Sequence, residues 1–177
     1  MKLHIGCGKR NLPGYKHFDI RPLDDHIDFI GTADDLSQFL DNSIEEIYAC
    51  HLLEHFGRND VDRVLTEWNR VLVEGGILRI AVPDFEAVAA EYTEKHDLSK
   101  VMGLLYGGQD YEFNYHFVTF DFATLKEHLE KCGFAGVERY DEKEFLPEDY
   151  DDYSRAYLPH MDFQNGRHMS LNVIARK

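Results

Sequence analysis

The sequence predicts an α/β fold, a mostly parallel sheet doubly wound with helices on both faces. The first observation is that short apolar runs, typical of buried strands, alternate with segments of helical periodicity. The second is that the first run, Leu3–Ile5, ends in the glycine turn Gly6-Cys7-Gly8, as a buried parallel strand does. A ligand crevice is therefore expected outside the carboxyl ends of the central strands.

The composition limits the classes of function. With 177 residues and 44% hydrophobic content, the chain suits one domain over residues 1–177. No apolar run approaches the roughly 18–20 residues that cross a membrane and no signal peptide is evident, so we expect a cytoplasmic protein without a membrane partner. The net charge of −14 disfavours nucleic acid. The three cysteines are isolated, and we predict no metal site.

The N-terminal third is predicted to consist of strands and loops. Strands are expected at Leu3–Ile5, His17–Ile20 and Ile27–Ile30. Pro13-Gly14 and the lack of helical periodicity predict a loop where a doubly wound fold normally has its first helix. A turn at Asp41–Ser43 then leads into a central strand at Ile44–Cys50.

The remaining chain alternates between helices and strands. The first helix is capped by Asn59 and stopped by Gly75-Gly76, the second, Phe85–His96, is capped by Asp84, and the third is capped by Asp121 and ends at Gly133. Strands are expected at Ile77–Val82, Val137–Tyr140 and Leu171–Ala175. The insert Val101–Phe120, with a short helix before Gly107-Gly108, and the long acidic connection Asp141–His168 are typical of functional loops.

Gly6, Gly8 and Asp19 form the most informative local motif. Glycines let the backbone approach a ligand closely because they lack a Cβ. A dinucleotide site would need a third glycine where the chain has Asn11, a later acid, and a helix N-terminus for the pyrophosphate. The motif instead favours a nucleoside without phosphates, with its ribose hydroxyls on the Asp19 carboxylate. An ordinary tight turn is the alternative interpretation.

At this point the sequence resembles the class I S-adenosylmethionine-dependent methyltransferases, in particular small, compact members. The resemblance covers nearly the whole chain and is carried by Leu3–Gly8, Leu12–Gly14, Phe18–Ile20, His51–His55, Arg70–Leu78, Val82–Asp84 and Cys132–Phe134. It implies a Rossmann-like, doubly wound sheet of seven strands whose last strand, Leu171–Ala175, is antiparallel. It also implies S-adenosylmethionine as the cofactor.

The same resemblance implies a set of cofactor-binding residues. Gly6, Cys7 and Gly8 would pass beneath the methionine part, Asp19 would bind the ribose, and Asp34, Asp35 and Leu36 would flank the adenine. Ile20 and His51 are the further candidates for cofactor binding. Either of the two aspartates could meet the adenine amine. The missing first helix leaves the cofactor less covered, so a lid from elsewhere in the chain or a second subunit of a homo-oligomer could be needed.

The segment His51-Leu52-Leu53-Glu54-His55 also matches the HxxEH motif of inverted zinc peptidases. A zinc-dependent hydrolase would require both histidines on one helical face and a third ligand downstream. Against this, His51 directly follows a predicted strand, and the next helix does not clearly begin before Asn59. The preferred interpretation is that His51 borders the cofactor or substrate while Glu54 and His55 fix the loop.

The expected activity is methyl transfer to a small polar acceptor, for which the resemblance suggests a sugar or sugar nucleotide. Such a transfer is an in-line displacement, in which the protein positions the acceptor and removes its proton. His116 is the first candidate base and His51 the second. The candidate substrate contacts are Asp84, Gln109, Tyr111, Asn114 and Arg155. A protein that binds S-adenosylmethionine without turning it over would have the same sequence features.

Overall fold

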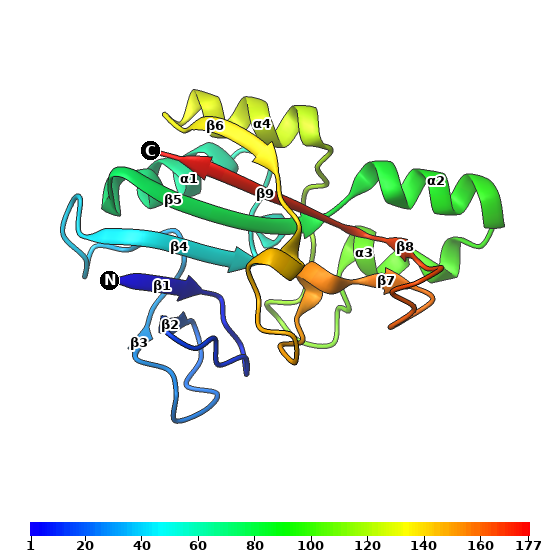
Figure 1. Cartoon of the computed structure of the whole chain (residues 1–177), viewed down its shortest axis with the longest axis horizontal. Helices are drawn as coiled ribbons and strands as arrows, with labels where there is room; N and C mark the ends of the chain where they lie inside the picture. The colour runs from blue at the N-terminus through cyan, green and yellow to red at the C-terminus, as the bar shows by residue number, and fades with distance from the viewer.

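The computed structural model describes residues 1–177. Its main sheet has seven strands, whose arrangement can be followed in Figure 1. They are β1 (Lys2–Ile5), β2 (Lys16–Asp19), β3 (Phe29–Ile30), β4 (Ile44–Cys50), β5 (Leu72–Pro83), β6 (Ala135–Arg139) and β9 (Ser170–Arg176). Their order is β3-β2-β1-β4-β5-β9-β6. Strands β1 to β5 pair in parallel, whereas β9 is antiparallel to β5 and β6. The predicted seven-stranded sheet with an antiparallel last strand is confirmed.

Four α-helices and several shorter elements complete the fold. The helices are α1 (Val61–Val71), α2 (Phe85–Lys95), α3 (Met102–Tyr106) and α4 (Phe122–Lys131). The 3-10 turns are η1 (Leu53–His55), η2 (Leu98–Lys100), η3 (Glu142–Glu144) and η4 (Tyr153–Arg155), and β7 (Tyr157–Leu158) pairs with β8 (Arg167–His168). This small hairpin lies within the long connection and was not predicted. None of the helices is long and apolar enough to span a bilayer.

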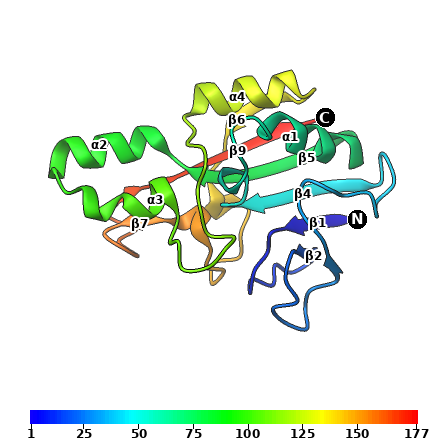
Figure 2. The same cartoon turned by 180° about the vertical axis from the view of Figure 1, so that it is seen from behind.

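The two faces of the sheet are covered differently. Helices α1 and α4 pack on one face, where α1 lies nearest the viewer in Figure 2. They enclose the main core, in which Trp68 and Leu65 of α1 are fully buried. On the opposite face, the connection between β6 and β9 covers β1 and β4, since Leu146 packs with Tyr48 and Leu12. On this face, the connection between β6 and β9 covers β1 and β4 in place of the expected layer of helices.

The first 52 residues contain no helix. The expected reduction of the first helix to a loop is confirmed, because the chain from Gly6 to Tyr15 runs through turns between β1 and β2. The segment between β3 and β4 is also built of turns. This part of the protein must therefore be held by polar contacts and loop packing rather than by helices of its own.

The predicted helix ends were correct at two places and wrong at two others. Asp84 and Asp121 cap α2 and α4, and Asp121 forms a capping box with Thr124. Asn59 does not cap α1, because the helix begins one residue later, after Asp60, without a side-chain cap. Gly75-Gly76 does not stop it, because the backbone already becomes extended at Leu72 and both glycines lie within β5.

Candidate functional site

The glycine turn after β1 opens the carboxyl edge of the sheet. Gly6 and Gly8 have φ values of 66° and 56°, which favour glycine. A Cβ on Gly6 would lie 2.8 Å from the Leu52 side chain, whereas a Cβ on Gly8 would meet nothing within 4 Å. Position 6 is thus fixed by packing, and position 8 borders open space that a ligand can occupy.

Asp19, at the end of β2, is buried beside this turn with 5% of its surface exposed. Its Oδ2 accepts a hydrogen bond from the Gly8 amide at 2.8 Å and its Oδ1 one from the Arg21 amide at 3.0 Å. The two N–H donors compensate the burial of the negative charge, and each oxygen keeps a lone pair. The arrangement fits two ribose hydroxyls. Neighbouring Cys7 is buried, and Ile20 is partly exposed.

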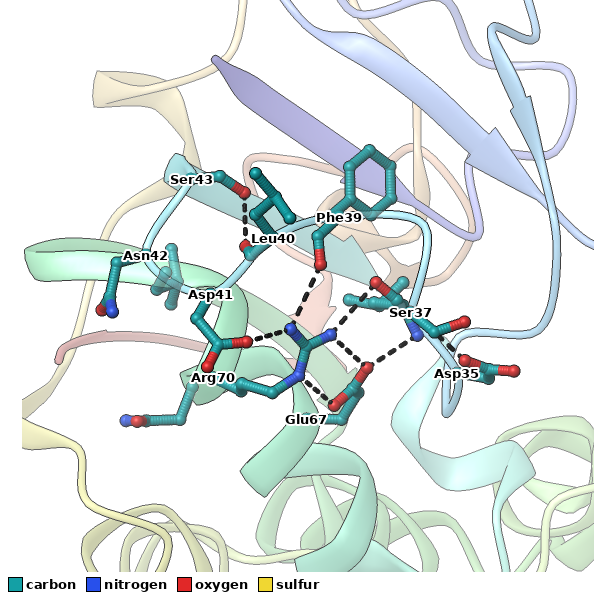
Figure 3. A network of polar contacts seen from close by, with 12 residues as sticks. Asp35, Ser37, Phe39, Leu40, Asp41, Asn42, Ser43, Glu67 and Arg70 are labelled. Carbon is teal, nitrogen blue, oxygen red and sulfur yellow. Dashed lines mark hydrogen bonds and ion pairs between the residues drawn. The ribbon is translucent and has the colours of Figure 1, made fainter.

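The loop between β3 and β4 is anchored to α1 by a polar network (Figure 3). The Leu36 amide donates to Glu67 Oε1 at 2.8 Å, and Arg70 Nη2 donates to the Leu36 carbonyl at 3.1 Å. The Leu36 side chain has no exposed surface, so it belongs to the core and offers adenine no contact. Asp34 pairs with Arg63 at 2.9 Å. Asp35 is therefore the freer of the two aspartates considered for the adenine.

Four polar residues gather next to the glycine turn, and we call His51, Glu54, His55 and His116 the HEH cluster. Glu54 has no exposed surface, and neither carboxylate oxygen has a hydrogen-bond partner. Its Oε1 lies 3.4 Å from His51 Nδ1 and 4.0 Å from His116 Nε2. The His55 and His116 rings are 4.7 Å apart. Because Leu52 contacts the Gly6 position, the cluster lies directly beside the candidate cofactor site.

Burial dominates the protonation of the HEH cluster. Desolvation raises the pKa of Glu54 to about 8 and lowers the pKa of His51 to about 3 and that of His55 to about 4. Burial also lowers the pKa of His116. In the protein alone, the cluster therefore favours neutral imidazoles and a protonated carboxyl group near pH 7.

The insert places His116 in the cluster and extends to the end of β2. The Phe117 amide donates to the Glu54 carbonyl at 2.9 Å, which fixes the segment against η1. Further along the edge, the Arg21 guanidinium lies 4.3 Å from the centre of the Tyr111 ring and donates to its hydroxyl at 3.2 Å. The insert thus runs past the Gly8–Asp19 region.

A second arginine–tyrosine contact borders the same edge. Arg10, in the loop after the glycine turn, donates to the Asp151 carbonyl at 2.8 Å and lies 5.7 Å from the Tyr153 ring. The Tyr153 ring is in turn 5.5 Å from that of His51. Sequence reasoning missed Arg10, Arg21 and Tyr153, because arginines in polar loops and tyrosines in acidic ones give no local signal of a long-range contact.

The other predicted substrate contacts are spread around this edge. Asp84 caps α2 and pairs with Arg139 at 3.1 Å. The Arg155 guanidinium donates to the Glu148 and Tyr150 carbonyls, and so holds its own loop together. Gln109 and Asn114 bind within the insert, to the Tyr106 carbonyl and to Asp110 respectively. Gln109, Tyr111 and Asn114 remain on the accessible part of the insert, since none of them is buried.

An open hollow of about 470 Å³ adjoins the HEH cluster. His116 lines it together with Arg58, Phe85, Leu105, Tyr106, Phe117, Val118 and Thr119. Its volume falls within the range of small-molecule sites, and its lining is mostly apolar with one cationic residue. It can hold an acceptor molecule beside His116.

The HxxEH segment does not form the helical pair of a zinc peptidase. Only Leu53–His55 is helical, as a single 3-10 turn, and His51 has φ 48° at the end of β4. His51 Nε2 is engaged with the Ser170 hydroxyl at 3.0 Å. The two histidines therefore do not project from one α-helical face as that motif requires.

Part of the chain matches one family model, and the whole chain is similar in fold to solved structures. Residues 16–80 match the family model described as "Methyltransferase domain". A methyltransferase from Archaeoglobus fulgidus described as SAM-dependent has a TM-score of 0.60 at 16% identity, covering 99% of this chain and 85% of that one. One from Methanosarcina mazei has a TM-score of 0.59 at 19% identity, covering 99% and 91%.

A third similar structure is a complex from Haloferax volcanii, between the Trm112 methyltransferase activator and a putative methyltransferase. Its TM-score is 0.58 at 16% identity, covering 99% of this chain and 80% of that chain. At these identities the structural likeness shows the fold alone. No curated protein matches the chain.

Proposed function

We propose that the chain is a class I S-adenosylmethionine-dependent methyltransferase that methylates a small polar acceptor held beside the HEH cluster; the family-model match over residues 16–80 and the shared fold support this. The observation that carries the cofactor half of this proposal is the Gly8–Asp19 contact. A buried carboxylate at the end of β2 has both oxygens oriented by backbone amides next to a glycine with open space above it.

The residues around this contact fit the parts of the cofactor. The main chain of Gly6, Cys7 and Gly8 would pass beneath the methionine part, and Asp19 would accept both ribose hydroxyls. Ile20, partly exposed after β2, and Asp35, with one oxygen bonded only to the Ser37 amide, would lie on the adenine side. When bound, S-adenosylmethionine supplies a methyl group on a positively charged sulfur, open to attack in line.

The protein must also remove the proton of the acceptor group that is methylated. The Nδ1 of His116 lies 2.9 Å from the Leu104 carbonyl, which can only accept, so Nδ1 carries the hydrogen and Nε2 has a free lone pair. That lone pair makes His116 the first candidate base. His51, bonded to Ser170, is the second candidate. An acceptor hydroxyl or amine in the hollow would lie beside His116, and Gln109, Tyr111 and Asn114, which do not line the hollow, stay proposed contacts for the rest of the acceptor.

The proposed acceptor is a small polar molecule such as a sugar or sugar nucleotide. The hollow has a size suited to such a molecule and a cationic residue, Arg58, in its lining. The cover over the site comes from the chain itself, through the Arg21–Tyr111 and Arg10–Tyr153 contacts. If these contacts suffice as cover, cofactor affinity should not depend on protein concentration.

The test is calorimetric titration with S-adenosylhomocysteine. Asp19→Ala removes two hydrogen bonds to a charged group, which are worth about 1.5–3 kcal/mol each, so the affinity should fall at least 100-fold. Asp25→Ala, an exposed aspartate on the following loop, is the control and should bind as the parent does. Unchanged affinity in Asp19→Ala would refute the site. Turnover of a sugar panel by His116→Ala and His51→Ala then shows which of the two histidines the reaction requires.

A further inference from the structure

Glu54 is the one residue of the HEH cluster whose surroundings the proposed function leaves unexplained. It is fully buried and neither of its oxygens has a donor. Buried carboxylates in folded proteins are normally paired, hydrogen-bonded or bound to a metal. The polar groups around Oε1 are imidazole nitrogens, at 3.4 Å on His51 and 4.0 Å on His116. The carboxylate therefore faces nitrogens across a gap instead of receiving a hydrogen bond.

His116 and His55, the two histidines of the cluster whose rings lie next to each other, are each held in one tautomer. His116 Nδ1 lies 2.9 Å from the Leu104 carbonyl and His55 Nδ1 lies 3.1 Å from the Tyr115 carbonyl. Since a carbonyl only accepts, each Nδ1 carries the hydrogen and each neutral ring keeps its lone pair on Nε2. A backbone carbonyl bonded to the other ring nitrogen is the arrangement typical of metal-binding histidines, because it fixes both tautomer and orientation.

The distances suit a small cation after a modest closure. One oxygen of Glu54 and one nitrogen each of His55 and His116 lie within 4.8 Å of one another. Bonds of about 2.0–2.2 Å from a tetrahedral metal place its ligand atoms about 3.5 Å apart. Side-chain rotation of Glu54 and His55 by roughly 1 Å would close the difference.

We propose that Glu54, His55 and His116 form a binding site for a divalent first-row transition-metal ion. Two imidazoles and one carboxylate suit Zn²⁺, Mn²⁺, Fe²⁺ or Co²⁺, whereas Mg²⁺ and Ca²⁺ prefer oxygen ligands. This is not the HxxEH arrangement, because the third ligand is His116 from the insert and His51 is engaged with Ser170.

The metal site would refine the proposed function, on which this step rests. With three protein ligands, the ion keeps positions that an oxygen of the acceptor in the adjoining hollow can fill. His116 would then be a ligand and not a base, since a lone pair given to a metal cannot take a proton. The acceptors favoured by such a site carry an oxygen atom that can bind the ion.

The experiment titrates Co²⁺ into the full chain after treatment with a chelator. Visible absorption and calorimetry should show one saturable site, with Zn²⁺ competing and Mg²⁺ not competing. Glu54→Gln and His116→Ala should each lower the affinity at least about 100-fold, beyond the 10- to 100-fold typical of losing a ligand's hydrogen-bond partner. His128→Ala is the matched control, because His128 also pairs with a carboxylate, Asp62, but on the surface.

A second measurement separates misfolding from lost binding. Metal at 100 times its dissociation constant should raise the melting temperatures of the parent and of His128→Ala by about 5–10 °C. The melting temperature of Glu54→Gln should not change. S-adenosylhomocysteine should still bind Glu54→Gln. No saturable binding in the parent, or equal binding in Glu54→Gln, would overturn the metal site. Metal binding without any cofactor binding would uphold the site and refute the methyltransferase proposal.

Discussion

Asp19 and Glu54 are two buried carboxylates at the same edge of one sheet, and their surroundings are opposite. Asp19 receives a backbone N–H on each oxygen and can still accept two more hydrogen bonds. Glu54 receives none, and burial raises its pKa to about 8. The first carboxylate is prepared for a neutral polyol such as ribose, and the second for a proton or a cation.

The regions around the two carboxylates also differ in how they are held to the rest of the protein. The Asp19 region, residues 1–43, has no helix and is tied to α1 through side chains such as Arg70. The Glu54 region is formed by η1 and the insert, which meet through the hydrogen bond from the Phe117 amide to the Glu54 carbonyl and through the edge-to-face contact of the His55 and His116 rings. We expect variants in the two regions to separate cofactor binding from metal binding.

The largest effect on stability should come from Arg70→Ala. Its guanidinium makes five hydrogen bonds, two of them to Glu67 and one each to Leu36, Phe39 and Asp41. Breaking this partly buried network should cost about 3 kcal/mol and lower the melting temperature by roughly 6–12 °C. The affinity for S-adenosylhomocysteine should fall as the loop loosens, while Co²⁺ binding stays.

Thermal denaturation checks this against Lys126→Ala, which removes only an exposed pair with Glu130 and should change stability by less than about 0.5 kcal/mol. Equal melting temperatures for the two variants would show that the Asp19 region is not held by this network.

An acid-sensitivity prediction concerns His4, in the floor of the Asp19 region. Burial, followed by repulsion from His17, His26 and Arg10, lowers the pKa of His4 to about 3. The unfolded value is near 6.5, so the unfolded chain takes up more protons below pH 6.5 and stability falls as the pH drops toward 3. His4→Phe should remove about 2 kcal/mol of the loss between pH 7 and pH 5.

Urea denaturation at the two pH values measures that difference. His4→Phe is a suitable variant because Nδ1 of His4 has no hydrogen-bond partner to lose, and the ring packs 5.0 Å from that of Tyr48. An identical pH dependence in parent and variant would contradict a neutral buried His4.

Gly8→Ala and Gly14→Ala form a matched pair. Both glycines have positive φ, 56° and 84°, and a Cβ on either meets nothing within 4 Å. Each substitution should cost about 1–2 kcal/mol for the left-handed conformation. Only the Gly8→Ala methyl enters the space assigned to the cofactor, so only this variant should lose S-adenosylhomocysteine affinity, by about tenfold for each 1.4 kcal/mol of clash. Equal S-adenosylhomocysteine affinities of Gly8→Ala and Gly14→Ala would show that the cofactor does not lie against Gly8.

Periodic and capping signals predicted the sheet and most helices, and failed where the chain departs from them. The strand Ile44–Cys50 has the predicted bounds, and Asp84 and Asp121 cap their helices as expected. Gly75-Gly76 misled because glycine in a strand and glycine after a helix look alike in sequence. The β7–β8 hairpin has two-residue strands, too short for a periodic signal.

The site was harder to predict than the fold. Gly6, Gly8 and Asp19 are close in sequence, so their spacing alone suggested a common ligand. Glu54 and His116 are 62 residues apart, and their approach depends on the Phe117 amide binding the Glu54 carbonyl. Nothing local shows that Glu54 is fully buried, since a glutamate in a polar loop is usually exposed.

The smallest effect is expected at Tyr111, where the insert meets the Asp19 region. Tyr111→Phe keeps the ring over Arg21 and loses one exposed hydrogen bond, whereas Tyr111→Ala also loses the cation–π contact, worth about 0.5–1 kcal/mol. Stopped-flow measurements should show that Tyr111→Ala releases S-adenosylhomocysteine a few-fold faster than the parent does. Tyr111→Phe should release it at almost the parent's rate. Unchanged release from both would mean that this contact does not cover the cofactor.

The most direct test is a crossed titration of Asp19→Ala and Glu54→Gln with S-adenosylhomocysteine and with Co²⁺. We predict that Asp19→Ala loses at least 100-fold in S-adenosylhomocysteine affinity and binds Co²⁺ within about twofold of the parent. Glu54→Gln should show the reverse. If both variants lose both ligands together, or neither loses either, the two carboxylates do not serve separate ligands and the account is contradicted.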